Sequence, residues 1–309
     1  MSSVLGSRWR RQPDVPWFES DDLEAYLAAS RFDAATETFV RDLARDGVAA
    51  IDLGPEALAL CDQVVADTED YFAEGAGRVQ DAWYRSAAVR RLADWPEVRR
   101  LLRAAYGRDP FPFQTLNFRQ GSQQHIHSDA IHFHSAPERF MCGVWIALED
   151  VQPEAGPLVY HPGSHRLPVL TMRGAGVTHD QPTHVDYERS YVPRFAAGIA
   201  AADLPVVQAT IRKGSALVWA ANLAHGGSPI RKPGATRRSL VTHHYFERCV
   251  YYTPMHSDVE AGRLHLRLPP NIRTGWWAWP RRGRWPVKVG RDVVMAAIQR
   301  DLRRRPQAF

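Results

Sequence analysis

Residues 141–148 read MCGVWIAL, residues 215–220 read SALVWA, and residues 237–246 read RRSLVTHHYF. Each run is rich in β-branched and aromatic residues, which favour strands, and Gly, Pro, Asn and Asp lie between the runs. Similar runs occur at 115–120, 156–161 and 206–214. Several short strands in the second half of a chain are typical of a double-sheet jelly roll, whose interior can hold a ligand.

The first third of the chain has helical patterns instead. Apolar residues at helical spacing predict helices over 35–46, over 55–73 and within 85–106. Gly47 follows the first of these as a C-terminal stop, and the run VAAIDL after it reads as a short strand. We therefore predict a mainly β protein with flanking helices and a jelly-roll core.

Length and composition fit a soluble globular protein. Of the 309 residues, 45% are hydrophobic and 24% are charged, and the 10 Trp residues predict substantial buried aromatic surface. Cys61, Cys142 and Cys249 are far apart and odd in number, which does not fit a disulfide framework or a zinc ribbon. The chain starts without the apolar region of a signal peptide, and no run is long and apolar enough to span a bilayer. We expect a soluble, cytoplasmic protein.

The net charge of +5 is unevenly distributed along the chain. Twelve Lys and Arg but only two acidic residues lie between Arg263 and Arg305, a local balance of +10, so the rest of the chain carries −5. A basic tail on an acidic body argues against nucleic-acid binding by the whole protein. We predict a small-molecule substrate, no nucleic-acid partner and no integral membrane segment.

Residues 121–137, GSQQHIHSDAIHFHSAP, contain four histidines and one aspartate. In an extended chain, residues two apart project to the same side, so His127 and Asp129 can reach one metal ion. His225, which follows an apolar strand run and precedes two glycines, is the candidate for a third ligand. Two His and one carboxylate form a facial triad with three open positions, the arrangement that suits non-haem Fe(II) oxygenases.

Ligand types alone leave other interpretations open. The His-x-Asp spacing occurs by chance in many proteins, and a His-rich loop can be a polar surface turn. Two His and a carboxylate also describe a catalytic zinc site. A zinc hydrolase would, however, be expected to carry a general-base motif such as HExxH, which the sequence lacks.

A possible anion clamp follows the third candidate ligand. Arg237 and Ser239 stand two apart on a predicted strand and therefore share a face, whereas Arg238 faces the other way. An Arg held by a barrel wall can capture a carboxylate with two hydrogen bonds, and a hydroxyl can add a third. Alternatively, both arginines are ordinary surface charges. A cupin-like protein that only binds metal, such as a sensor or an isomerase, has no need of such a clamp.

Three motifs occur in a fixed order: HSD at 127–129, GVWIALEDVQPEAGPLVYHPGSH at 143–165, and HGGSP to RRSLVTHHY at 225–245. Together they resemble the phytanoyl-CoA dioxygenase family of 2-oxoglutarate-dependent oxygenases, over about residues 35–250. The resemblance implies a double-stranded β-helix (jelly-roll, cupin-like) core, with Fe(II), 2-oxoglutarate and O2 as cofactor and co-substrates. It implies a dioxygenase that hydroxylates or otherwise oxidises a small molecule and releases succinate and CO2.

The same resemblance implies His127, Asp129 and His225 as the iron ligands. Family members that halogenate have a small residue in place of the carboxylate ligand, whereas Asp129 is present here, so hydroxylation or a related oxidation is expected. The gap from His225 to Arg237 is about one residue longer than is usual in the family. Arg238 is therefore the alternative anchor if the register shifts by one.

Five residues are implied to hold the co-substrate. Arg237 matches the partner of the distal carboxylate of 2-oxoglutarate, and Ser239 fits the Arg-x-Ser pattern of the family. Trp145 falls where the family places an aromatic wall beside the co-substrate. Thr115 and Asn117, which alternate with apolar residues, are further candidates for the same pocket.

We predict one oxygenase domain over 1–309. It consists of an N-terminal lead-in (1–34), helices and a jelly-roll core (35–250) and a basic Trp/Arg-rich extension (251–309). Within the core, residues 170–205 do not read as a regular element and predict either an active-site lid or a surface loop. We nominate this insertion, with His132 or His134, as the substrate side of the site.

The C-terminal extension allows two interpretations. Its Arg and Trp residues could contact an anionic substrate or membrane surface. In the alternative, a helix near 290–304 docks its apolar face, with Val293, Val294, Ala297 and Ile298, on the core, and the Trp residues pack beneath it.

Overall fold

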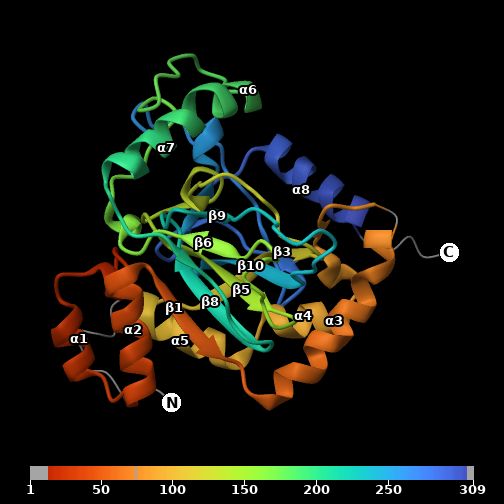
Figure 1. Ribbon diagram of the computed structural model, residues 1–309. Helices are drawn as coiled ribbons and strands as arrows, with labels where there is room; N and C mark the ends of the chain where they lie inside the picture. Colours follow the sequence, from red (N-terminus) through yellow and green to blue (C-terminus); the bar gives the residue numbers. More distant parts are fainter. Residues whose placement is uncertain (1–12, 74, 305–309) are drawn as a thin grey trace.

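A computed structural model describes residues 13–73 and 75–304 (Figure 1). Its centre is an antiparallel sheet of six strands in the order β1-β8-β5-β10-β3-β2. The strands are β1 (Val48–Asp52), β8 (Ser215–Ala220), β5 (Met141–Ala147), β10 (Ser239–Phe246), β3 (Pro110–Phe118) and β2 (Val79–Gln80). The three strand-like runs β5, β8 and β10, far apart in the sequence, are therefore neighbours in space.

Smaller antiparallel sheets complete the β structure. One has the order β7-β6-β9, and β11 pairs with β4. Their bounds are β7 (Val207–Gln208), β6 (Leu158–Tyr160), β9 (His225–Gly227), β11 (Val250–Tyr252) and β4 (His134–Ala136). Apolar side chains of the large sheet, among them Trp145 and Leu217, pack with Leu158 of β6 in one buried cluster. Sheets facing each other across such a layer confirm the jelly-roll prediction.

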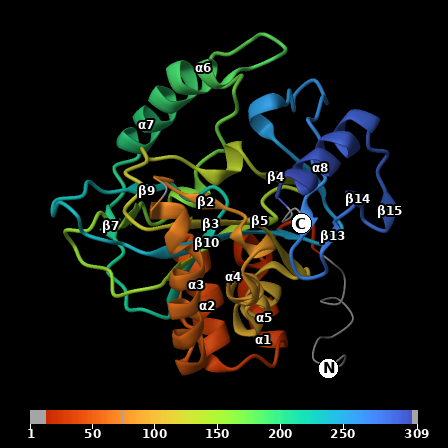
Figure 2. The same ribbon diagram turned by 90° about the vertical axis from the view of Figure 1, so that its right-hand side faces the viewer.

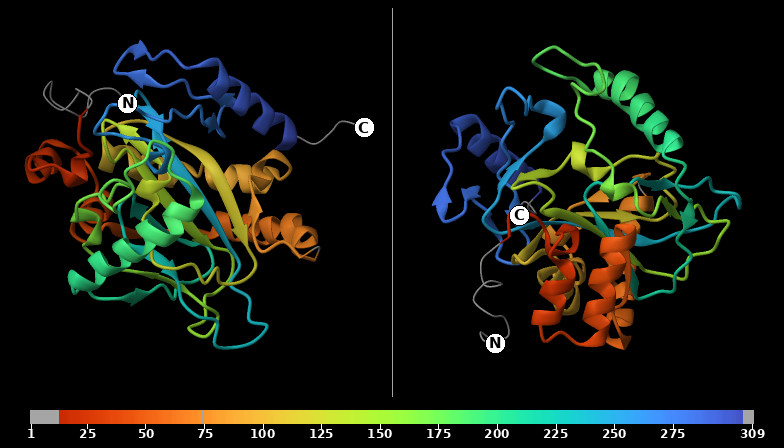
Figure 3. Two further views of the ribbon diagram at one scale, coloured as in Figure 1. Left: turned by 90° about the horizontal axis from the view of Figure 1, so that it is seen from above. Right: turned by 90° about the vertical axis from the view of Figure 1, so that its left-hand side faces the viewer.

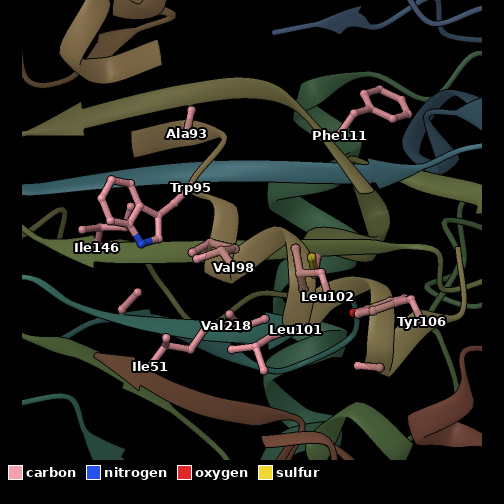
Figure 4. Packing of buried hydrophobic residues seen from close by; sticks show 14 of the residues in the cluster. Ile51, Ala93, Trp95, Val98, Leu101, Leu102, Tyr106, Phe111, Ile146 and Val218 are labelled. Atoms are coloured by element: carbon pink, nitrogen blue, oxygen red, sulfur yellow. The ribbon is translucent and has the colours of Figure 1, made fainter. Parts of the chain in front are cut away.

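Helices cover the opposite face of the large sheet (Figure 2). They are α1 (Leu23–Ala29), α2 (Ala34–Asp46), α3 (Pro55–Ala73), α4 (Ala87–Ala93) and α5 (Pro96–Tyr106). The apolar face of α5, with Leu101 and Leu102, points at the strands that carry Ile146 and Val218 (Figure 4). This layer covers the back of the sheet, and the cavity described below lies on the other side.

The predicted helix within 85–106 is two helices in the structure. The chain leaves the helical conformation at Asp94 and Trp95 and starts again at Pro96, the first residue of α5. Proline has no N–H and disfavours a helical residue before it, so it fits the first turn of a helix and not the interior.

The prediction that 170–205 lacks a regular element is wrong. The structure has one continuous helix there, made of α6 (His184–Asp186), a π-helical turn (Tyr187–Tyr191) and α7 (Val192–Ala201). We call residues 184–201 the insertion helix. Its buried residues recur at a spacing of four and are Tyr187, Tyr191, Phe195 and Ile199. Gly198 and Pro193 obscured this stripe in the sequence, but its burial against Ile131 and Ala224 overrides their low helix propensity.

The insertion helix and the C-terminal extension lie on the side of the sheets away from α2 and α3 (Figure 3). The extension contains the hairpins β12 (Pro270–Asn271) with β13 (Trp276–Trp277) and β14 (Arg281–Arg282) with β15 (Trp285–Pro286), and α8 (Arg291–Arg304). Ala297 of α8 is buried, but Trp276 and Trp285 are 79% and 65% exposed. The expectation that the tryptophans pack beneath the helix is therefore wrong for these two.

Short helical turns connect the larger elements. They are η2 (Trp17–Glu19), η3 (Ala82–Tyr84), η4 (Asp129–Ile131), η5 (Ser164–Arg166) and η7 (Pro254–His256).

Cys61, Cys142 and Cys249 are all buried as free thiols. None of the helices among the described residues has the length and apolar character needed to cross a membrane.

One glycine of the large sheet makes room for an aromatic ring. A Cβ added to Gly143 on β5 would overlap the indole of Trp219, its cross-strand partner on β8. We expect Gly143→Ala to lower the free energy of unfolding by about 1–3 kcal/mol, because overpacking a core displaces rigid neighbours. Urea denaturation measures this change.

Gly198→Ala is the matched control, since an added Cβ on this residue of α7 meets no atom within 4 Å. It should leave stability unchanged or raise it by up to about 1 kcal/mol. An equal effect of the two substitutions would show that Gly143 has no packing role.

Candidate metal centre

A backbone bridge brings the two candidate histidine ligands together. His127 N donates to His225 O at 2.9 Å, and His225 N donates to His127 O at 2.9 Å. His225 is the first residue of β9, so the small sheet fixes its position. The imidazole rings of the two residues lie with their centroids 4.4 Å apart. Residues almost a hundred positions apart thus form one side of a site.

Asp129 is held by the turn that follows His127. Ser128 caps this turn, because its Oγ accepts from Ala130 N and donates to Ala221 O at 3.0 Å. Ala130 N also donates to Ala221 O at 3.0 Å. These bonds tie the turn to the loop before His225, so the carboxylate and the second imidazole move as one unit.

The three side chains can hold a metal ion. One nitrogen of each of His127 and His225 and one oxygen of Asp129 all lie within 4.8 Å of one another. Asp129 and His225 are 4% and 5% exposed, and His127 is half-buried towards a cavity. Two imidazoles and a carboxylate on one side leave coordination positions open on the other, as in non-haem iron sites.

Hydrogen bonds fix which nitrogen of each ring is free. Nδ1 of His127 lies 2.9 Å from His125 O, and Nδ1 of His225 lies 3.0 Å from Leu223 O. A carbonyl oxygen only accepts, so each Nδ1 carries the proton and each Nε2 keeps its lone pair for a metal. Burial, with repulsion from His225, lowers the pKa of His127 to about 3, so this ring is neutral at pH 7.

The Asp129 carboxylate has two further partners that the sequence did not reveal. Trp219 Nε1 donates to Asp129 Oδ2 at 2.8 Å, and His243 Nε2 lies 3.5 Å from the same oxygen. Burial alone would raise the pKa of Asp129, but the nearby His243 and His225 outweigh it and hold the pKa below the usual range. His243 lies on the same strand face as Ser239, four residues away, which is the signal that could have identified it.

Arg237 lies buried in the wall of the cavity that the three candidate ligands also line, without an acidic partner among the described residues. It is 2% exposed, and its guanidinium carbon lies 5.3 Å from the centre of the Trp145 ring and 6.0 Å from that of Phe118. Among the described residues its side chain donates one hydrogen bond, from Nη2 to Gln120 O at 3.5 Å. Burial, opposed by Glu149, lowers the pKa of Arg237 to about 10. An unpaired buried guanidinium is costly unless an anion joins it.

Three buried polar atoms, one of Arg237 and two of its neighbours, have no hydrogen-bond partner among the described residues. Ser239 Oγ, Trp145 Nε1 and Arg237 Nε are all buried and have no hydrogen bond with the described residues. Ser239 and Val241 of β10 pair with Ala147 and Trp145 of β5, so these side chains share one face. A ligand with several oxygen acceptors would satisfy all three atoms, and the far carboxylate of a diacid has that chemistry.

Arg238 points away from Arg237, Ser239 and Trp145. Its Nη2 lies 3.0 Å from Glu69 Oε2 of α3, and its backbone N donates to Glu149 Oε1. Arg237, rather than Arg238, is therefore the arginine that faces the cavity.

The structure does not place Thr115 and Asn117 in this pocket, so that expectation is wrong. They pair with Thr242 and Leu240 of β10, whose side chains face the helical layer. Both are buried there, and neither lines the cavity. Side chains alternate along a strand, so it is the neighbouring Leu116 and Phe118 that face the cavity.

A cavity of about 540 Å³ runs from Arg237 past the three candidate ligands to the insertion helix and the C-terminal extension. His132 lines it, with its ring 5.1 Å from that of Tyr187 of the insertion helix. His134 does not line it, and packs on the ring of Tyr252 instead. Of the two nominated histidines, only His132 lines the cavity.

Comparison with known proteins agrees with this architecture. The family model described as Phytanoyl-CoA dioxygenase (PhyH) matches residues 43–239. No curated protein matches the sequence.

Solved structures of other proteins resemble this one. The α-ketoglutarate-dependent epimerase SnoN from nogalamycin biosynthesis has 21% identity and a TM-score of 0.54 over 84% of this chain and 95% of its own. The carbocyclase SnoK from the same biosynthesis has 18% identity and a TM-score of 0.53, over 72% of this chain and 87% of its own. EctD from S. alaskensis, solved with 2-oxoglutarate and 5-hydroxyectoine, has 17% identity and a TM-score of 0.51, over 70% of this chain and 76% of its own. These likenesses show the double-stranded β-helix fold.

Buried histidines make the metal-free protein sensitive to acid. Burial lowers the pKa of both His132 and His134 to about 4, whereas an unfolded chain binds these protons near pH 6.5. The unfolded state therefore binds more protons between these values, and the free energy of unfolding should fall as the pH drops through this range. Urea denaturation with a chelator present measures this fall in the free energy of unfolding.

His134→Phe removes one of these protons and keeps an aromatic ring against Tyr252. It should reduce the slope of unfolding free energy against pH by about 1 kcal/mol per pH unit between about pH 6 and 5. An unchanged slope would contradict the assignment.

Proposed function

Since the chain belongs to the phytanoyl-CoA dioxygenase family of Fe(II)- and 2-oxoglutarate-dependent oxygenases, we propose that it hydroxylates a small organic substrate. In this reaction a substrate C–H, O2 and 2-oxoglutarate become a C–OH, succinate and CO2. The observation that carries the proposal is the buried, unpaired Arg237 beside three convergent metal-ligating side chains.

In this proposal His127, Asp129 and His225 hold Fe(II). Bound iron supplies the activation of O2, a chemistry that no amino-acid side chain provides. The two Nδ1–H bonds to carbonyl oxygens keep both rings turned towards the ion. Trp219 orients the carboxylate by donating to its second oxygen, which leaves the first oxygen to face His225. Such outer partners set ligand geometry and basicity.

Arg237, Ser239 and Trp145 would bind 2-oxoglutarate. The guanidinium can donate two parallel hydrogen bonds to the far carboxylate, the hydroxyl can add a third, and the indole forms a wall. Because Phe118 and Trp145 exclude water around Arg237, the charge pair is stronger than it would be at a surface. Binding at this end places the keto acid of the molecule towards the metal ligands.

The insertion helix would cover the substrate. Its Tyr187 lines the cavity and packs with Ile131, two residues after Asp129, in one buried cluster. Residues that close a site hold the reacting C–H in place and exclude water. A cupin-like protein that only binds metal is the alternative, but it offers no reason to bury Arg237 unpaired.

The first test is the formation of succinate from 2-oxoglutarate by anaerobically iron-loaded protein after exposure to O2, with a metabolite library as substrate. We expect Asp129→Ala to abolish succinate formation, because two imidazoles alone hold Fe(II) weakly. Undiminished succinate output from Asp129→Ala would refute the ligand assignment.

The two neighbouring arginines provide a matched pair of variants. Arg237→Gln should weaken the affinity for 2-oxoglutarate at least about tenfold, since it removes a charge-assisted pair of hydrogen bonds. Arg238→Gln, on the outer side, should change it little. The visible absorption of the anaerobic Fe(II)–2-oxoglutarate complex measures both. The opposite order of the two effects would show that the anchor is Arg238.

The reaction type is tested by the product. A hydroxylated product gains 16 mass units from ordinary O2 and about 18 from ¹⁸O2, whereas an epimer keeps the mass of the substrate. An epimer as the only product would replace hydroxylation by stereochemical inversion.

A further inference from the structure

The cavity has a second guanidinium, at the end away from Arg237. Arg267 of the C-terminal extension lines it, with its guanidinium carbon 4.8 Å from the centre of the Phe133 ring and 6.0 Å from that of Phe113. Its Nη1 donates to Thr253 Oγ1 at 3.0 Å. Its Nε is buried and has no hydrogen-bond partner among the described residues. Neither Asp nor Glu of the described chain forms an ion pair with it.

The metal ligands lie between the two arginines. Arg237 stands just before β10, and His243 lies six residues further along, a distance of about 20 Å in an extended chain. His243 Nε2 lies 3.5 Å from Asp129 Oδ2. The centroid of the His243 ring lies 5.0 Å from that of Phe133, the ring on which the Arg267 guanidinium stacks. A molecule held by Arg267 would therefore approach the candidate metal ligands from the end of β10 that is away from the 2-oxoglutarate anchor.

The other charged groups of the cavity do not neutralise Arg267. Glu188 of the insertion helix lies 3.6 Å from His184 and is about half exposed. Asp129 faces His225 and Trp219. Arg78 is exposed and lies near the Arg237 end instead, because Val79, the next residue, pairs with Asn117 of β3. This end of the cavity is therefore positive, and its walls carry Phe133, Tyr187 and Met255.

A guanidinium stacked on an aromatic ring can be structural, since the cation–π contact and the bond to Thr253 already hold it. That reading does not account for the buried, unpartnered Nε or for the absence of a carboxylate partner in the described chain. A planar fork with free donors, aimed into a cavity of drug-like size, is suited to a planar oxyanion.

We propose that the substrate of this enzyme is an anionic small molecule with an apolar body and a carboxylate that binds Arg267. The apolar body lies against Phe133, Tyr187 and Met255, and the C–H to be oxidised faces the metal ligands. The proposal rests on the proposed function and adds the substrate class to it. Arg267 is then the residue that sets substrate specificity.

The test uses matched probes, namely a panel of aromatic and alicyclic carboxylic acids and their primary amides, which have the same shape without the charge. Each is titrated by calorimetry into anaerobic Fe(II)- and 2-oxoglutarate-loaded protein at constant ionic strength. The unaltered protein should bind at least one acid about tenfold or more tightly than its amide. Arg267→Gln should remove this preference, and Arg267→Lys should retain part of it.

Arg282→Gln, an exposed arginine of the same extension, is the matched control and should keep the preference of the unaltered protein. Equal affinities of acids and amides for the unaltered protein, or an undiminished preference in Arg267→Gln, would overturn the proposed substrate class. A preference lost in Arg282→Gln as well would assign it to the general charge of the extension and overturn the role of Arg267.

The visible absorption of the Fe(II)–2-oxoglutarate complex separates this test from that of the proposed function. If the unaltered protein forms no such band, the oxygenase proposal fails. The acids and amides are then compared on the metal-free protein, in which Arg267 still lines the cavity. The preference for acids, and its loss in Arg267→Gln, decides the substrate proposal there by the same criterion.

Discussion

The backbone bridge between His127 and His225 is the interaction on which the site depends. Two hydrogen bonds of 2.9 Å join the His-x-Asp turn to the first residue of β9. Ser128 and Ala130 also donate to Ala221 O, which connects the turn to the loop between β8 and β9. The sheets thus position the donor atoms before any ion arrives. A preorganised site binds its ligand without an ordering cost, and it keeps one side of the ion open.

Buried charge sets the polarity of the cavity around this site. Arg237 at one end and Arg267 at the other lack acidic partners among the described residues, while Asp129 lies between them. An isolated protein gains nothing from leaving a buried guanidinium such as that of Arg237 without an anion. Arg267 is only partly buried, but its Nε is buried without a partner among the described residues, so we interpret both arginines as halves of ion pairs that ligands complete. In our proposal, the diacid binds at the Arg237 end of the cavity and the substrate at the Arg267 end.

Much of the fold could be predicted because the strands of the core carry strong β patterns and the early helices carry clear stops such as Gly47. The insertion helix was not predicted because the burial of Tyr187 and Tyr191 against the core, and not local helix propensity, stabilises it. The three candidate metal ligands, which the fold brings together, followed from spacing and resemblance. Thr115 and Asn117 were wrong by one position of strand alternation. His243 could have been identified from its spacing to Ser239, whereas Arg267 could not, because only the folded chain brings the C-terminal extension to the cavity.

The central claim is that three side chains hold one Fe(II) while Arg237 anchors a diacid beside it. A crystal structure of the anaerobic protein with Fe(II) and 2-oxoglutarate, with anomalous scattering to locate iron, tests it most directly. The account predicts one iron peak bounded by His127, Asp129 and His225, with the far carboxylate of 2-oxoglutarate on Arg237. Iron bound elsewhere, or a diacid that does not reach this arginine, would contradict it.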